Sequence, residues 1–264
     1  MVHCFFSRAK GDMQIDRKCV AGHVAPLMVW VGVIFLLQAL EAAQMCPRVL
    51  YPWSYAVKSV VCAGLFVWLR PWRIYPALKR AQVPLALLVG AAVAAVWIFP
   101  ETPWLGRVAP GVQAFYHRWC IMMPGAFPDY YSPAVFPALP LGHKSLVFSP
   151  AEAGWPLTVM KLVGSAGVIA VVEEFFFRGF FYRWIRNARF WTIPMASFDA
   201  QAFWITVAVF GLEHDRWLAG MFAGLAYGWL AARTGGVWAA ALAHGLTNLL
   251  LGAYVVLSGQ YGFW

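Results

Sequence analysis

The residues best suited to chemistry lie within apolar stretches of the chain. Glu173 and Glu174 are adjacent, and Arg178 follows Glu174 by four positions. In an α-helix Glu174 and Arg178 share one face, whereas Glu173 points about 140° away from Arg178. Glu174 and Arg178 can therefore neutralise each other. That leaves Glu173 as the acid that can face a small hydrated cavity and act as a general base.

Two later stretches add polar side chains of catalytic type. His214 lies at the end of one apolar stretch, and His244 and Asn248 lie four positions apart within another. Each has a simpler interpretation alone, because a histidine at a span end is often an interfacial residue and polar pairs often hydrogen-bond across membrane helices. Together with Glu173, they place four polar groups on three spans, which favours one convergent site.

Two alternatives remain open for these residues. Glu173, Glu174 and Arg178 can instead form an intramembrane ion-pair cluster that holds helices together, although one acid is then unexplained. A zinc ion held by Glu173, His214 and His244 is also chemically possible. The HExxH, GxSxG and GxGD motifs of other peptidases are absent. We expect no metal or other cofactor, because Asn248 is a poor zinc ligand.

The elements that position these residues are membrane helices. Of 264 residues 62% are hydrophobic and only 12% are charged, and the mean hydropathy is +0.65. A soluble domain with this composition would have too few polar residues to cover its surface. We expect an all-α fold, a polytopic transmembrane helix bundle of about seven spans, seven or eight in all. The predicted spans are 24–44, 54–69, 83–99, 160–184, 200–215, 217–232 and 236–257. The GxxxGxxxG pattern of Gly220, Gly224 and Gly228 allows helices to approach closely.

The spans divide the chain into four parts. Residues 1–23 form a basic cytoplasmic arm, 24–99 a three-span part, and 157–264 a four-span catalytic core. Residues 100–156 are rich in proline and aromatic residues, which predicts an extracytoplasmic loop, either structural or acting as a lid or re-entrant piece.

The distribution of basic residues predicts the orientation. The net charge of +9 arises from residues between apolar spans, which argues against a nucleic-acid partner. Most Lys and Arg lie on the side of the N-terminus, which favours a cytoplasmic N-terminus. The basic residues predicted on the opposite side are Arg48, Lys58, Arg107, Arg118, Lys144, Lys161 and Arg216. The five cysteines show no CxxC spacing and are expected to be structural thiols.

Over roughly residues 155–255 the sequence resembles a known family. The resemblance is to the CAAX-protease and bacteriocin-processing family of glutamic-type intramembrane peptidases, which has three motifs in this order. The matching positions are Glu173-Glu174-x-x-x-Arg178, Phe210-x-x-x-His214 and His244-x-x-x-Asn248. The resemblance implies that Glu173 activates a water, that His214 helps to hold it, and that His244 and Asn248 donate to the oxyanion. Glu174, Arg178 and Phe210 would be structural support.

The N-terminal part loosely resembles the subgroup that accompanies bacterial exosortase systems. This likeness rests on Tyr51-Pro52-Trp53 and on the run from Trp97 to Glu101. The chain departs from the eukaryotic prenyl-protein branch of the family, which has eight spans where seven are counted here, and this difference argues against a prenylated substrate.

These resemblances imply a multi-pass protein, in the bacterial inner membrane, that cleaves a membrane-associated protein near its C-terminal region. Membrane lipids and that protein or peptide would be its partners. The alternative is a non-catalytic immunity, scaffold or transport protein that uses the same polar cluster for binding.

Overall fold

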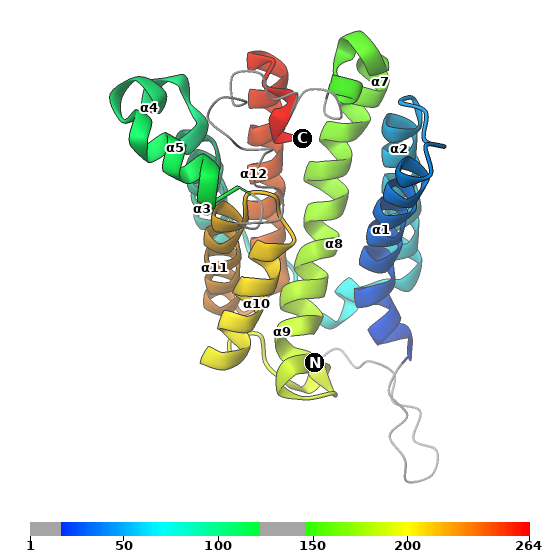
Figure 1. Ribbon diagram of the computed structural model, residues 1–264. Coiled ribbons are helices and arrows are strands. Elements are labelled where there is room, and N and C mark those ends of the chain that lie inside the picture. Colours follow the sequence, from blue (N-terminus) through cyan, green and yellow to red (C-terminus); the bar gives the residue numbers. More distant parts are fainter. Residues whose placement is uncertain (1–16, 122–145) are drawn as a thin grey trace.

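The computed structural model describes residues 17–121 and 146–264 of the chain. These residues form a helix bundle and contain no strand, which confirms the all-α prediction (Figure 1). Most of the predicted basic arm and the proline-rich residues 122–145, with Lys144, lie outside the described residues.

Three helices form the N-terminal part. They are α1 (Arg17–Ala42), α2 (Leu50–Leu69) and α3 (Val83–Ile98), with short 3-10 helices η1 (Pro71–Ile74) and η2 (Arg80–Gln82) before α3. α1 and α2 run antiparallel, side by side (Figure 1). The three predicted spans therefore correspond to real helices, although α1 begins seven residues earlier than predicted, at Arg17.

Prolines divide the segment after α3 into short helices. η3 (Phe99–Glu101), α4 (Pro103–Val108) and α5 (Pro110–Trp119) follow one another, and after the gap η5 (Leu146–Phe148) leads to a helix that begins at Pro150. Proline is compatible with a first helical turn because that position has no intrahelical N–H bond to lose. The described parts of the predicted loop are therefore mostly helical. α4 and α5 lie at the end of the bundle opposite the start of α1 (Figure 1).

One long helix carries the Glu-Glu-x-x-x-Arg motif. It runs through α7 (Pro150–Val163), η6 (Gly164–Ile169), α8 (Ala170–Glu174), η7 (Phe175–Phe181) and α9 (Tyr182–Arg186). η6 and η7 are π-helical turns that flank α8, an arrangement found often at functional sites. Gly154, with φ 76°, and Pro156 kink its first turns.

The C-terminal part contains a short helical hairpin. η8 (Phe190–Thr192) leads to α10 (Ala200–Leu212), a tight turn follows, and α11 (Trp217–Thr234) returns toward the end from which α10 came. α12 (Val237–Ser258) then crosses the bundle, and η9 (Tyr261–Phe263) ends the chain. In Figure 1 the turn between α10 and α11 lies near mid-height of the long α7–α9 helix.

The hairpin begins with a helix shorter than the predicted span. The sequence predicted that residues 200–215 cross the membrane and leave Arg216 on the far side, but α10 has 13 residues, which span about 20 Å. Arg216 is buried and pairs with Glu101 of η3. Lys58 and Lys161, also predicted on the far side, line an internal cavity. The sequence did not predict which helices would pack around Lys58 and Lys161.

The number of membrane spans is smaller by strict criteria than the seven predicted. Among the described residues five helical stretches are long and apolar enough to cross a membrane: Arg17–Ala42, Leu50–Leu69, Arg80–Glu101, Pro150–Arg186 and Val237–Ser258. α10 is apolar but shorter. The count of seven is therefore not confirmed.

Glycines let α12 approach its neighbours closely. A Cβ on Gly90 of α3 would collide with the carbonyl oxygen of Ala243, and one on Gly245 would lie 2.7 Å from that of Ala166. α12 is therefore fixed between α3 and η6, with its polar residues turned toward α8. Gly220, Gly224 and Gly228 similarly face α10, as expected for packing residues.

Candidate active site

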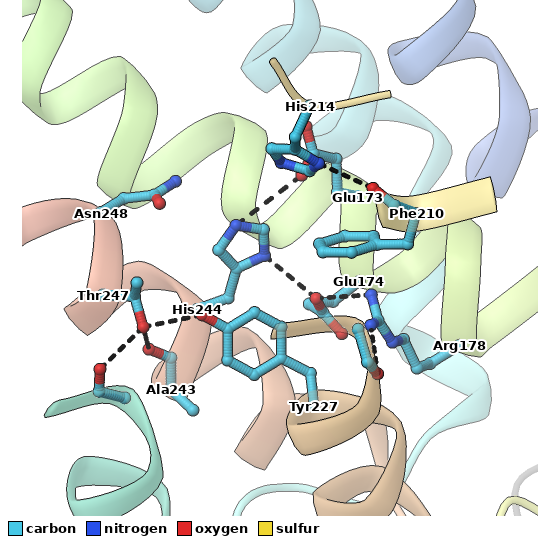
Figure 2. A network of polar contacts seen from close by, with 12 residues as sticks. Glu173, Glu174, Arg178, Phe210, His214, Tyr227, Ala243, His244, Thr247 and Asn248 are labelled. Carbon is cyan, nitrogen blue, oxygen red and sulfur yellow. Dashed lines mark hydrogen bonds and ion pairs between the residues drawn. The ribbon is translucent and has the colours of Figure 1, made fainter. Parts of the chain in front are cut away.

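The predicted catalytic residues meet at one cavity. Glu173, His214, His244 and Asn248 all line a cavity of about 490 Å³ inside the bundle. They come from α8, the turn after α10, and two successive turns of α12 (Figure 2). The structure thus brings together the four side chains that the sequence placed on three separate spans.

His244 lies between the two adjacent glutamates. Its Nδ1 lies 3.0 Å from Oε1 of Glu174, and its Nε2 lies 3.7 Å from Oε2 of Glu173 (Figure 2). Glu174 also binds Arg178, with 2.9 Å between Oε1 and Nη1. The expected Glu174–Arg178 pair is therefore present. Glu174 additionally contacts His244, and Glu173 has an imidazole neighbour.

Arg178 is held behind the cavity. Its Nη2 donates to the carbonyl oxygen of Gly224 at 3.0 Å, and its guanidinium lies 4.3 Å from the ring centre of Phe210. Arg178 and Glu174 are buried and do not line the cavity, so their pair faces the helix packing rather than a substrate. Phe210 lines the cavity with its ring and supports Arg178 on the other side.

His214 has a fixed tautomer in its neutral form. Its Nδ1 lies 2.7 Å from the carbonyl oxygen of Phe210, and since a carbonyl only accepts, Nδ1 must donate. Nε2 then carries the free lone pair. The ring of Trp97 packs edge-on against the imidazole, with 5.4 Å between the ring centres. Ligand atoms of Glu173, Glu213 and His214 lie within 4.8 Å of one another, which is close enough for one water to bridge Glu173 and His214.

Asn248 and Tyr227 complete the wall beside His244. Nδ2 of Asn248 donates to the carbonyl oxygen of Ser165 at 2.9 Å, which leaves its second N–H hydrogen for another acceptor. The Tyr227 ring stacks on His244 with 4.8 Å between the centres and an interplanar angle of 20°. Its hydroxyl donates to Thr247 at 2.7 Å, and Thr247 contacts the Gly90 carbonyl oxygen at 2.9 Å. These contacts fix the orientation of His244 within α12.

The cavity extends from these residues toward one end of the bundle. Its lining includes the second half of α1 from Trp30 to Glu41, the first half of α2 from Tyr51 to Lys58, and Phe263 and Trp264. These segments lie toward the end where α1 ends and α2 begins, away from the start of α1 (Figure 1). The N-terminal helices are therefore part of the cavity wall.

Sequence reasoning missed several residues of this site. Tyr227 has no polar neighbour in sequence that would mark it. Lys58 and Lys161, near the starts of the predicted spans 54–69 and 160–184, were counted only as charges on the far side. Glu213 offered a signal, because it precedes His214 directly. The short length of α10, whose following turn carries both residues, was the missing information.

The group of side chains close enough together to hold a metal ion differs from the predicted zinc ligands. Among the described residues Glu173, Glu213 and His214 form the group that could hold a cation, and His244 is not in it. Two carboxylates and an imidazole suit a divalent metal chemically. The arrangement is thus compatible with a metal as well as with a metal-free water.

A comparison with protein-family models gives a match, and it covers the segment that contains all three motifs. Residues 155–250 are Rce1-like. The matching model is described as type II CAAX prenyl endopeptidase Rce1-like, and it extends from α7 into α12. The predicted family resemblance is confirmed for this segment, and the Rce1-like match supports a protease in a membrane. The likeness to the exosortase-associated subgroup is not confirmed. No curated protein and no solved structure gives a match.

Proposed function

We propose that this protein is a multi-pass intramembrane endopeptidase in which Glu173 activates the attacking water. The observation that carries the proposal is the position of Glu173. Its carboxylate lies within 4.8 Å of a ligand atom of His214 and 3.7 Å from Nε2 of His244, on the wall of a cavity. The Rce1-like match of residues 155–250 supports the reaction class.

The proposed reaction begins with a water held between Glu173 and His214. Glu173 accepts a proton from the water while the oxygen attacks the carbonyl carbon of the scissile peptide bond. The tetrahedral intermediate then collapses, the C–N bond breaks, and the proton on Glu173 passes to the leaving amine. His214, with Nδ1 donating to Phe210, offers Nε2 as an acceptor that orients the water.

His244 and Asn248 are proposed to stabilise the oxyanion. A protonated His244 donates from Nδ1 to Glu174 and keeps a second N–H at Nε2 for the cavity. Asn248 keeps one amide hydrogen after its bond to Ser165. A preorganised donor of this kind is worth about 3–4 kcal/mol in barrier height. Glu174 and Arg178 then act as positioning residues, because they touch His244 or its partner and not the substrate.

The direction of the cavity suggests where the substrate enters. The cavity extends toward the end of the bundle away from the start of α1. A cytoplasmic N-terminus, as the basic residues indicate, makes that end extracytoplasmic. The proposed substrate is therefore a membrane-associated protein cut near its C-terminal region outside the cytoplasm, with the enzyme in a bacterial inner membrane.

The test compares protein termini in the native host. Cells that express wild type, Glu173→Ala or the control Glu152→Ala are compared by mass spectrometry of membrane-anchored and secreted proteins. Glu152 is an exposed acid on the first turn of α7, far along the helix from the site. The proposal predicts new termini with wild type and Glu152→Ala that disappear with Glu173→Ala at equal membrane abundance. Identical termini in all three would favour the non-catalytic alternative.

A further inference from the structure

Two lysines on the cavity wall have no role in the proposed reaction. Lys58 of α2 and Lys161 of α7 both line the cavity that contains Glu173. Lys58 is only 6% exposed. Its Nζ lies 4.2 Å from the ring centre of Trp30 and 4.8 Å from that of Tyr55. Nζ of Lys161 lies 4.1 Å from the same Tyr55 ring, so both ammonium groups gather around one aromatic side chain.

Neither lysine has a carboxylate partner within the part of the chain that the structure describes. Arg178, Arg216 and His244 form ion pairs there, whereas no ion pair of Lys58 or Lys161 is found among the described residues. The acidic residues on the cavity wall are Glu173 and Glu41, and Glu41 is hydrogen-bonded to Tyr51. Charged groups inside a membrane protein are costly and are usually paired or functional. Two unpaired cations in one cavity therefore suit an anionic ligand.

Lys58 and Lys161 lie close enough to the proposed catalytic base, Glu173, for one short peptide to reach both. Lys161 precedes Glu173 by twelve positions on one continuous helix, which corresponds to a rise of about 18 Å between their backbones and sets an upper limit for the span between the lysines and the base. An extended peptide covers this limit in about five residues, so fewer residues suffice where the side chains reach toward each other. One substrate chain can therefore place its scissile bond at Glu173 and, a few residues further along, a second group at the two lysines.

We infer that Lys58 and Lys161 bind the free C-terminal carboxylate of the substrate peptide. The inference rests on the proposed peptidase function and gives it a specificity element. The bound carboxylate would limit cleavage to bonds within about five residues of the chain end. A carboxylate is favoured over a lipid phosphate because Lys58 is enclosed by aromatic rings and shares its cavity with the catalytic residues.

The test uses purified protein in nanodiscs and a library of twelve-residue apolar peptides, each made as a free acid and as a C-terminal amide. Binding is measured with Glu173→Gln, so that no peptide is consumed, and cleavage with the active enzyme. Further variants carry the double change Lys58→Met with Lys161→Met, the charge-preserving pair Lys58→Arg with Lys161→Arg, or the control Lys79→Met. Lys79 is an exposed residue outside the cavity.

We expect the acids to bind about tenfold more tightly than the amides, with the preference lost in the double Met variant and kept in the double Arg and Lys79→Met variants. Released fragments should contain no more than about five residues. Equal binding of acids and amides, or a preference that survives the double Met change, would overturn the inference. So would loss of the preference in anionic but not zwitterionic lipid, since an anionic lipid headgroup would then be the occupant. If acids bind in a lysine-dependent way but no peptide is cleaved, the proposed function fails and the anion site stands.

Discussion

His244 and Glu174 are joined by a contact of 3.0 Å between Nδ1 and Oε1, on the side of the imidazole away from Glu173. The same carboxylate oxygen binds Arg178 at 2.9 Å. One buried acid therefore holds both the guanidinium and the imidazole. The second glutamate of the motif is thus tied to the orientation of the cavity residue as well as to helix packing.

Glu174→Gln tests this link. The change leaves the buried Arg178 charge unpaired, and breaking a buried pair in this way costs about 3–5 kcal/mol. We expect a lower melting temperature in detergent and at least about a tenfold loss of peptide hydrolysis. The double variant Glu174→Gln with Arg178→Met should recover much of the stability but not the activity. Full recovery of activity in the double variant would show that Glu174 does not position His244.

Two variants of Tyr227 separate the effect of its ring stacking on His244 from that of its hydroxyl bond to Thr247. Tyr227→Phe keeps the ring that stacks on His244 and removes only the hydroxyl bond to Thr247, which costs about 1 kcal/mol. We expect activity close to wild type for Tyr227→Phe and a clear loss of kcat for Tyr227→Leu, measured on the same peptide. Similar kcat values for the two variants would contradict a role for the stacked ring.

Asn248→Ala tests the proposed oxyanion donor. Loss of one such donor typically lowers kcat by about 10²–10³ with little change in KM. The same variant also loses the bond to Ser165, so its melting temperature must be measured alongside. A variant that folds normally and retains kcat within a few-fold of wild type would remove Asn248 from the mechanism.

Gly90→Ala tests how closely α3 and α12 must approach. The added methyl group would collide with the Ala243 carbonyl oxygen, one position before His244. We expect a lower melting temperature and reduced activity. Gly32→Ala is the matched control, because nothing lies within 4 Å of its added Cβ. Equal stability of the two variants would mean that the helix contact tolerates expansion.

Chelation tests the expectation that no metal is needed. Glu173, Glu213 and His214 are close enough to hold a divalent cation, so the outcome is informative. We expect hydrolysis to continue unchanged after treatment with a strong chelator in detergent. Loss of activity that zinc restores would replace the metal-free mechanism with a metal-assisted one.

Much of the site could be predicted because local spacing determines it. The four-residue interval between Glu174 and Arg178 places them on one helical face, and their pair is present. The arrangement of helices around the site could not be predicted in this way. Arg216 and Glu101 are 115 positions apart, and no local pattern links them. Where Lys58 and Lys161 lie likewise depends on how α1, α2 and α7 pack, which periodicity alone does not specify.

The position of His214 across the membrane could not be predicted from local sequence either. The predicted span 200–215 puts His214 toward its far end, about 10 Å from the level of Glu173, unless the span is shorter, is tilted or has a shifted boundary. The helix instead ends at Leu212, and its following turn lies near mid-height of the bundle. The length of a helix that ends inside a protein depends on its neighbours, and hydropathy does not record it.

The most direct test of the account is the rate of peptide hydrolysis by reconstituted Glu173→Gln, compared with wild type and with Glu152→Gln. Glutamine has nearly the same shape but does not act as a base. We predict a loss of at least about 100-fold for Glu173→Gln at an unchanged melting temperature, and wild-type rates for Glu152→Gln. Hydrolysis by Glu173→Gln within tenfold of wild type would contradict the claim that Glu173 activates the water.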